Sequence, residues 1–308
     1  MSPAVTRLAL LTSGGDAPGM NAALWALTNG ARALGWEVLG VREGLRGLLE
    51  HDFLPLDEAV TLPWARRGGT ALGTARLEDF PSHLAAAVER LEFEDVSKLV
   101  ILGGNGSALA AAALSVPVPT AFIPATIDND VVDSDASLGF DTALNTALQL
   151  GDGIRDSAEA LPRLFSLETL GGKTVFLAQA VALALGVDAL LVPERPLEEK
   201  DVVVRLEAAV KTHRYALLVA SEGYPDVSGV VERLSSALGT RSRFTRIGHA
   251  QRGGRPSGRD RLLARAFAET ALSGLAQNES GRALWQDGRA VWRPFAERGV
   301  KPFVDTPL

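Results

Sequence analysis

The sequence predicts an α/β protein with mainly parallel sheets, organised in two lobes. Short apolar runs typical of buried strands alternate with amphipathic stretches of helical spacing, which is the pattern of parallel βαβ units. The chain has 308 residues, more than a domain with a single core usually contains. Its hydrophobic fraction of 46% is ordinary for a well-buried globular protein. These observations together favour two α/β lobes.

The predicted strands are short and rich in Val, Ile, Leu and Ala. Several are continuously apolar, because helices cover both faces of a parallel sheet. In chain order they are Leu8–Thr12, Glu37–Val41, Leu99–Leu102, Val118–Ile123, Leu164–Glu168, Ala189–Val192, Ala216–Ala220 and Phe244–Ile247.

Helices are predicted in the gaps between these strands, where apolar residues recur at helical spacing. The clearest are Met20–Leu34, Ser82–Leu91, Asp141–Ser157, Val202–Lys211 and Arg259–Leu272. No Pro/Gly-rich linker separates the lobes, so we divide them on pattern. One lobe is expected to contain residues 1–138 and 251–308, and the other residues 139–250.

Charge and composition limit the binding partners and the cellular location that we expect. The formal net charge of −6 disfavours the broad basic face that such partners need, so we expect neither nucleic acid nor an anionic membrane as a partner. The chain has no cysteine, which excludes disulfides and thiolate metal sites and fits a reducing compartment. The first apolar run is too short for a signal peptide or a membrane span. We therefore expect a cytoplasmic protein.

Two glycine-rich segments follow predicted strands and lead into helices. The first is Ser13-Gly14-Gly15-Asp16, and the second is Gly103-Gly104-Asn105-Gly106-Ser107. Such turns aim backbone N–H groups and a helix N-terminus at an anion, which predicts phosphate binding. The first lacks the Gly-Lys-Ser/Thr of a Walker loop, and the second lacks the third glycine of a dinucleotide fingerprint. Simple tight turns are the alternative for each.

A third segment, Thr126-Ile127-Asp128-Asn129-Asp130, places two carboxylates directly after a buried strand. Open α/β sheets bind ligands at such strand ends, and paired carboxylates there are candidates for proton transfer. An isolated Asp-Asn-Asp would more often shape a turn or cap a helix. The segment Ser137–Ala143, which then runs into a predicted helix, makes the functional interpretation the better one.

The chain resembles the bacterial 6-phosphofructokinase family, of the ATP-dependent type, over almost its whole length. The resemblance rests on six ordered segments: Leu11–Asn21, Gly68–Arg76, Gly103–Ser107, Thr126–Asp130, Gly139–Ala143 and Gly248–Gly254. It implies the phosphofructokinase fold, with two Rossmann-like lobes. The larger lobe would bind ATP with Mg²⁺ and the smaller fructose 6-phosphate, usually in a homotetramer.

The resemblance also implies roles for residues on the phosphoryl-donor side. Asp128 would be the general base for the sugar 1-hydroxyl, with Thr126 and Asp130 orienting the acceptor and Arg76 contacting the nucleotide. The remaining nucleotide-binding positions are Gly14, Gly15, Gly104, Asn105, Gly106 and Ser107.

For the sugar phosphate, the resemblance implies Arg163, Glu222, Arg243, His249 and Arg252. Arginines suit bidentate phosphate binding, and a carboxylate accepts hydrogen bonds from sugar hydroxyls. In the family, Arg163 and Arg243 reach across a subunit interface. These residues do not select one hydroxyl, so tagatose 6-phosphate and sedoheptulose 7-phosphate stay open as substrates.

Departures from the family pattern fall on the donor side. Asn105 stands where the family has a metal-binding Asp, and a neutral amide is the weaker Mg²⁺ ligand. Gly172 and Pro81 replace arginines, and losing one charge-stabilising donor costs roughly 10² to 10³ in rate.

Four further positions bear on the phosphoryl donor and on regulation. Ala125 and Gly106 depart from the pyrophosphate-dependent pattern, which favours ATP. Trp25 and Asn29 stand where regulated members present arginines to an effector, although Arg155 keeps one basic group nearby.

These departures leave two hypotheses. The first is an ATP-dependent 6-phosphofructokinase of glycolysis, at full or reduced activity. The second is a catalytically impaired paralogue that binds fructose 6-phosphate as a sensing subunit, in a hetero-oligomer with another phosphofructokinase.

Overall fold

The computed structural model describes residues 5–75, 77, 79–172, 174–195, 198–295 and 301–302. It divides into two compact units. The first contains the chain up to Asp141 and the segment Arg252–Lys301, and the second contains Thr142–Gln251. The sequence analysis places the lobe boundaries after residues 138 and 250. The last six residues of the chain, 303–308, lie outside the described residues.

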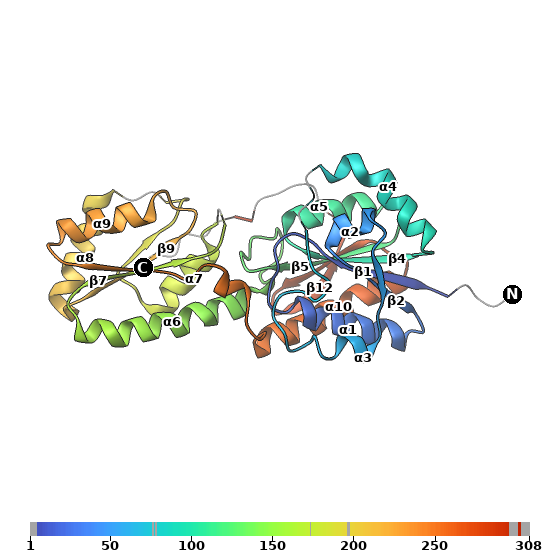
Figure 1. Ribbon diagram of the computed structural model, residues 1–308, viewed down its shortest axis with the longest axis horizontal. Coiled ribbons are helices and arrows are strands. Elements are labelled where there is room, and N and C mark those ends of the chain that lie inside the picture. The colour runs from blue at the N-terminus through green and yellow to red at the C-terminus, as the bar shows by residue number, and fades with distance from the viewer. Residues whose placement is uncertain are drawn as a thin grey trace. The chain divides into compact units, whose positions relative to one another are not determined.

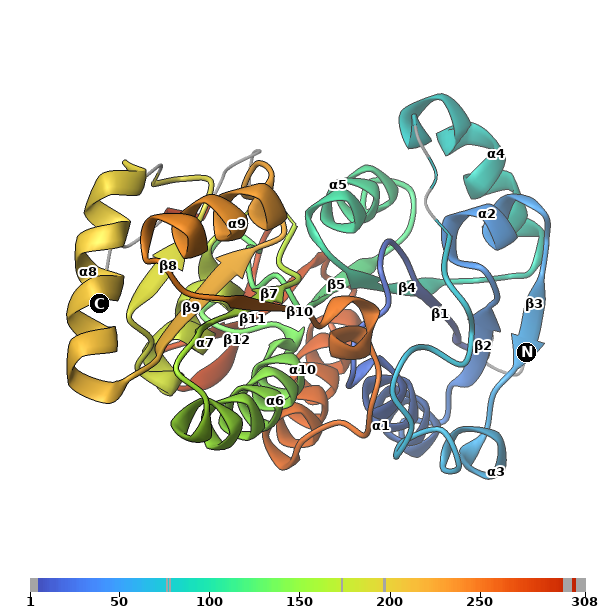
Figure 2. The ribbon, with the colours of Figure 1, turned by 60° about the vertical axis from the view of Figure 1, so that its left-hand side comes forward.

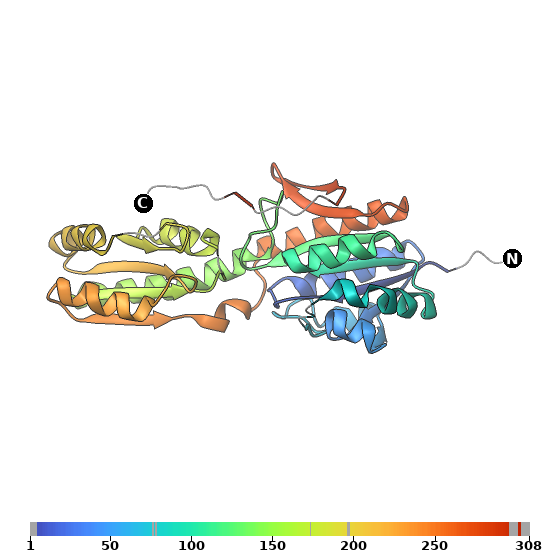
Figure 3. The same ribbon diagram turned by 90° about the horizontal axis from the view of Figure 1, so that it is seen from above.

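The first unit is built on an eight-stranded sheet whose order is β12-β11-β5-β4-β1-β2-β3, with β6 paired to β5. The pairs β2–β3 and β11–β12 are antiparallel, and the other pairs are parallel. Figure 3 shows the β11–β12 hairpin at the edge of this sheet. The strands are β1 (Arg7–Thr12), β2 (Glu37–Val41), β3 (Phe53–Pro55), β4 (Lys98–Gly103), β5 (Thr120–Thr126), β6 (Leu138–Gly139), β11 (Gly281–Gln286) and β12 (Arg289–Arg293).

Helices cover both faces of this sheet, which explains its continuously apolar strands. α1, α3 and α10 lie on one face, and α2, α4 and α5 lie on the other (Figures 1 and 2). The second group buries Leu45, Leu91 and Leu114 against Leu99 and Phe122 of the sheet. The bounds are α1 (Met20–Ala33), α2 (Gly44–Leu49), α3 (Glu58–Thr61), α4 (Phe80–Phe93), α5 (Asn105–Leu114) and α10 (Gly258–Ala276).

The order of the parallel strands changes direction between β1 and β4. From β1 the chain first adds β2 on one side, then returns to place β4 on the other side of β1. The crossovers leave β1 and β4 in opposite directions, so their carboxyl ends flank the place where an open α/β sheet binds its ligand. Both glycine-rich segments begin at these two strand ends.

The second unit is a four-stranded parallel sheet of order β10-β7-β9-β8. Helices α8 and α9 bury Val202, Leu206 and Val230 against one face, and α6 and α9 lie on opposite sides of the sheet (Figure 2). The elements are β7 (Leu164–Thr169), β8 (Ala189–Leu191), β9 (Ala216–Ser221), β10 (Ser242–Arg246), α6 (Phe140–Ala160), α7 (Phe176–Leu185), α8 (Glu199–His213), α9 (Val227–Ala237) and the 3₁₀ helix η1 (Gly248–Arg252).

The predicted α/β class with mainly parallel sheets is confirmed. One predicted strand starts too early, because the observed strand begins at Thr120 rather than Val118. Pro117 and Pro119 flank Val118, and proline has no N–H for a sheet ladder. Among the described residues, none of the helices is long and apolar enough to span a membrane.

Candidate functional site

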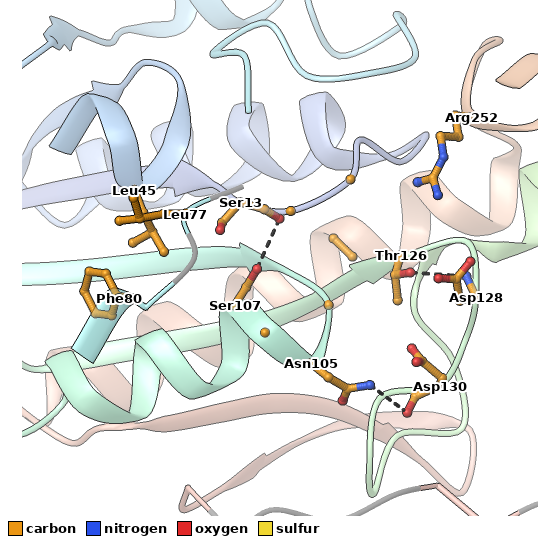
Figure 4. A pocket seen from close by; sticks show the side chains of 15 residues that line it. Ser13, Leu45, Leu77, Phe80, Asn105, Ser107, Thr126, Asp128, Asp130 and Arg252 are labelled. Carbon is orange, nitrogen blue, oxygen red and sulfur yellow. Dashed lines mark hydrogen bonds between the residues drawn. The ribbon is translucent and has the colours of Figure 1, made fainter. Parts of the chain in front are cut away.

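A cavity of about 370 Å³ opens in the first unit at the carboxyl ends of β1, β4 and β5 (Figure 4). It brings together both glycine-rich segments and the carboxylate segment after β5. Its lining residues are Ser13, Gly14, Gly15, Leu45, Leu77, Phe80, Gly104, Asn105, Gly106, Ser107, Ala125, Thr126, Asp128, Asp130 and Arg252.

The two glycine-rich segments are tied to each other. Ser107 Oγ donates a hydrogen bond to the carbonyl of Ser13 at 3.1 Å, and Ser13 N donates to the carbonyl of Leu102 at 2.9 Å. Gly103 must be glycine, because a Cβ there would overlap the Ser107 side chain and the Ser13 carbonyl. The close approach of the two chains therefore depends on a missing side chain.

The N-terminus of α5 faces this cavity. Its N-cap, Gly104, has no side chain to accept a hydrogen bond from the first-turn N–H groups. Asn105 and Gly106, in that first turn, are exposed. Unsatisfied N–H groups and the helix dipole at an N-terminus attract an anion, so this end of α5 suits a phosphate group.

The carboxylate segment is held by hydrogen bonds to its own backbone. Asp128 N donates to Thr126 Oγ1 at 3.2 Å, as Figure 4 shows. Ser137 Oγ donates to the carbonyl of Thr126 at 2.6 Å and lies 3.2 Å from Asn129 Oδ1. Asn129 has a left-handed backbone with φ of 52°, which turns the chain between the two carboxylates. The turn presents Asp128 and Asp130 to one cavity.

Asp130 lies in a partly desolvated position. Burial raises the pKa of its carboxyl group, and hydrogen bonds and the charge of Lys301 oppose the shift. Asn105 Nδ2 donates to the Asp130 carbonyl at 3.3 Å, which brings the start of α5 against the carboxylate segment. A cation or a phosphate-bound metal would relieve the cost of the buried charge.

The oxygen atoms of Asn105, Asp128 and Asp130 are the ligand type that Mg²⁺ prefers. A nucleotide-bound Mg²⁺ commonly takes one or two carboxylates and completes its octahedron with phosphate oxygens and water, so this set fits the ion. Among the residues that the structure describes, no group of three or more His, Cys, Asp or Glu forms a ready-made metal site. The phosphates would therefore have to complete the coordination.

Arg252 lies in this first cavity, although the sequence assigned it to the sugar phosphate. Its Nη1 donates to the carbonyl of Asp16 at 3.3 Å. A Cβ at Gly15 would come within 2.5 Å of the same nitrogen. The guanidinium thus lies over the first glycine-rich segment, in the cavity that Asp128 also lines.

One end of the cavity is apolar, which the sequence analysis did not foresee. Leu45 comes from α2, Leu77 precedes α4 and Phe80 begins it. Leu45 and Phe80 are buried, and Leu77 is partly buried. An apolar wall beside a phosphate-binding turn fits a nucleobase.

A second pocket, of about 390 Å³, lies in the second unit at the carboxyl ends of β7, β9 and β10. It contains the predicted Glu222 and His249. Glu222 Oε1 accepts hydrogen bonds from the N–H groups of Gly171 at 3.2 Å and Gly172 at 2.9 Å. The full lining is Glu168, Leu170, Glu222, Tyr224, Asp226, Val227, Ser228, Arg246, Gly248 and His249.

Two predicted sugar-phosphate ligands lie elsewhere in this unit. Arg163 directly precedes β7, whereas the pocket is at the carboxyl end of that strand. Arg243 is exposed near the start of the edge strand β10, and its Nη1 donates to the carbonyl of Ser242 at 3.0 Å. A single chain therefore does not bring these arginines to Glu222 and His249. The predicted Arg76 lies outside the described residues.

The fold and the first cavity define a parallel α/β phosphate-binding protein with paired carboxylates at the strand ends. A family model described as phosphofructokinase matches residues 7–275. The chain belongs to the phosphofructokinase family.

Relatives and solved structures agree. An ATP-dependent 6-phosphofructokinase 1 of Thermus thermophilus is 39% identical over 299 residues, covering 94% of this chain and 93% of the relative. One from Staphylococcus carnosus is 37% identical, covering 91% and 92%. The phosphofructokinase structure from Saccharomyces cerevisiae has a TM-score of 0.88 at 25% identity, over 94% of this chain and 45% of that one. A T-state structure from Pichia pastoris gives 0.90 at 27%, over 96% and 35%.

Proposed function

We propose that this chain is an ATP-dependent 6-phosphofructokinase, which transfers the γ-phosphate of ATP to the 1-hydroxyl of fructose 6-phosphate in glycolysis. One observation carries the proposal. A single cavity joins two glycine turns, the N-terminus of α5 and the segment Thr126–Asp130. The first two features bind phosphate, and the third supplies carboxylates for the acceptor.

In this mechanism the phosphates of ATP bind to the backbone N–H groups of Gly14, Gly15 and the first turn of α5. Asn105 and Asp130 would hold Mg²⁺, which would neutralise negative charge on the phosphates of ATP when it is bound. Asp128 takes the proton of the 1-hydroxyl as that oxygen attacks the γ-phosphorus, and the bond from the γ-phosphorus to the bridging oxygen breaks to release ADP. Thr126 Oγ1, which accepts from Asp128 N, holds the turn that aims the carboxylate.

The apolar wall of Leu45, Leu77 and Phe80 supports ATP rather than pyrophosphate as donor, because pyrophosphate has no base to bury there. The relatives named above are ATP-dependent enzymes by name. They favour a working enzyme over the sensing subunit, which rests on the neutral Asn105 and on the arginines missing at Gly172 and Pro81.

The second unit would bind the sugar phosphate, with Glu222 and His249 in its pocket. Arg163 and Arg243 lie away from that pocket. The resemblance implies that they reach across an interface to the sugar-phosphate site of a neighbouring subunit. We therefore propose a homotetramer in which sugar binding depends on assembly, in the cytoplasm. A hetero-oligomer with another phosphofructokinase subunit is the alternative assembly.

A coupled assay of fructose 1,6-bisphosphate formation tests this function. Mg²⁺–ATP and Mg²⁺–pyrophosphate are supplied separately to the purified protein, with fructose 6-phosphate as acceptor. Turnover with ATP and not with pyrophosphate is expected. Turnover with pyrophosphate alone would overturn the assigned donor, and sugar-phosphate binding without turnover would favour the sensing subunit.

A further inference from the structure

The pocket of the second unit contains more carboxylates than an anion-binding pocket should tolerate. Glu168, Glu222 and Asp226 line it together with Arg246 and His249. Two backbone N–H groups donate to Glu222 and stabilise its negative charge. Asp226 caps α9 through Gly229 N at 3.2 Å and pairs with Arg233 at 3.3 Å. Glu168 is compensated by Arg246, the arginine among the pocket's lining residues.

The Arg246–Glu168 pair is fixed by the sheet. Strands β10 and β7 are adjacent and parallel, and their register places Arg246 opposite Glu168. Arg246 Nε donates to Glu168 Oε1, and Nη2 donates to Oε2 at 3.2 Å. The guanidinium also lies over the Phe244 ring, 5.6 Å from its centroid. The arginine is thereby held in one orientation, bidentate on a carboxylate.

The two partners differ sharply in exposure. The side chain of Glu168 is 7% exposed, whereas that of Arg246 is 62% exposed. A guanidinium has two edges that can each bind an oxyanion, Nε/Nη2 and Nη1/Nη2. Glu168 occupies the first edge, and on the second we find no acceptor among the described residues. Arg246 therefore presents a free fork from a buried anchor.

We propose that Arg246 binds the phosphate group of the sugar phosphate through its Nη1/Nη2 edge, while Glu168 holds the other edge and positions it. This inference rests on the proposed function, in which this pocket takes a sugar phosphate. The resemblance already implies Arg163, Arg243 and Arg252 as phosphate ligands. Arg246 would be a further one, in the same pocket of the same chain as Glu222 and His249. The fork geometry matches phosphate oxygens, and the hydrogen bonds to Glu168 hold the guanidinium in place.

A purely structural role is the competing account. Arg246 would then only neutralise the buried Glu168, and its removal would disturb the pocket by leaving a carboxylate unpaired. The double variant Glu168→Gln with Arg246→Met separates the two accounts. This variant removes both charges of the pair. If Arg246 has only a structural role, the variant should bind fructose 6-phosphate with normal affinity. If Arg246 is a phosphate ligand, the affinity should stay reduced.

Isothermal titration with fructose 6-phosphate tests the proposal on the full-length protein. Arg246→Gln and the double variant are both expected to weaken binding roughly 10- to 100-fold, the range of a charge-assisted hydrogen-bond pair. Arg246→Lys should recover little, since an ammonium lacks the fork. Arg205→Gln, at an exposed position of α8, removes the same charge and should bind normally.

Inorganic phosphate serves as the second probe, by competition with fructose 6-phosphate. Its inhibition should weaken in Arg246→Gln and not in Arg205→Gln. Normal affinity in Arg246→Gln, or in the double variant, would overturn the inference and leave the proposed function intact. Wild-type protein that neither binds nor converts fructose 6-phosphate would instead overturn the proposed function itself.

Discussion

Ser107 Oγ donates a hydrogen bond to the carbonyl of Ser13 at 3.1 Å, and this one contact ties the start of α5 to the loop after β1. Both partners line the cavity to which we assign the nucleotide phosphates. Ser107 is 3% exposed and Ser13 is 4% exposed, so water does not easily replace the bond. The geometry of the phosphate-binding turns therefore depends on a buried hydroxyl.

Ser107→Ala should weaken ATP binding without affecting fructose 6-phosphate. The variant leaves the Ser13 carbonyl unsatisfied, which costs about 1 to 3 kcal/mol and loosens the first turn of α5. We expect the KM for ATP to rise about 5- to 50-fold. Ser115→Ala, at the other end of the same helix, removes a hydroxyl bonded to Ala112 and is the control. Equal KM values for ATP in the two variants would contradict this role.

Gly103→Ala and Gly106→Ala should have opposite effects on stability. A Cβ at Gly103 would overlap the Ser107 side chain and lie 2.5 Å from the Ser13 carbonyl oxygen, so the backbone must move. A Cβ at Gly106 meets nothing within 4 Å, and alanine favours a helix by up to about 1 kcal/mol over glycine. Thermal unfolding should show a lower Tm for the first and an equal or higher Tm for the second. The reverse order would mean that the two loops are not closely packed.

Leu77→Ala tests the apolar wall as a base-binding surface. Losing about 1 to 2 kcal/mol of apolar contact should raise the KM for ATP about 5- to 20-fold. Inhibition by tripolyphosphate, which has no base, should not change. Leu84→Ala truncates a leucine that packs on the same core cluster without lining the cavity, so it controls for stability. If inhibition by tripolyphosphate weakens as much as the KM for ATP rises, the wall does not bind the base.

Asn105→Asp tests the donor-side departure. A carboxylate at this position is a stronger ligand for a hard cation than an amide oxygen, and it removes the Nδ2 bond to the Asp130 carbonyl. We expect half-maximal activity at a several-fold lower Mg²⁺ concentration. Asn105→Ala should shift the requirement upward. A Mg²⁺ requirement that is the same in all three proteins would show that residue 105 is not near the metal.

Much of this site could be predicted, because its residues follow strands at recognisable turns. Gly14, Gly104, Asn105 and Asp128 lie at the carboxyl ends of parallel strands, and such ends meet at one edge of a sheet. The structure brings them into one cavity as that rule requires.

Other features depended on distances that no local pattern encodes. Leu45, Leu77 and Phe80 are ordinary core leucines and a phenylalanine in sequence, and only their packing places them at the cavity. The Arg246–Glu168 pair joins residues 78 positions apart through the register of β7 and β10. The β11–β12 hairpin did carry a local signal, because Asp287-Gly288 is a preferred two-residue turn and both residues have positive φ.

The central claim is that Asp128 is the base of a phosphoryl transfer, and the kinetics of Asp128→Asn test it most directly. The amide keeps the shape of the side chain but cannot take a proton, so kcat with Mg²⁺–ATP should fall roughly 10²- to 10⁴-fold. The Kd for fructose 6-phosphate, measured by calorimetry, should change little. A variant that keeps wild-type kcat, or a wild-type protein with no turnover to lose, would contradict the account.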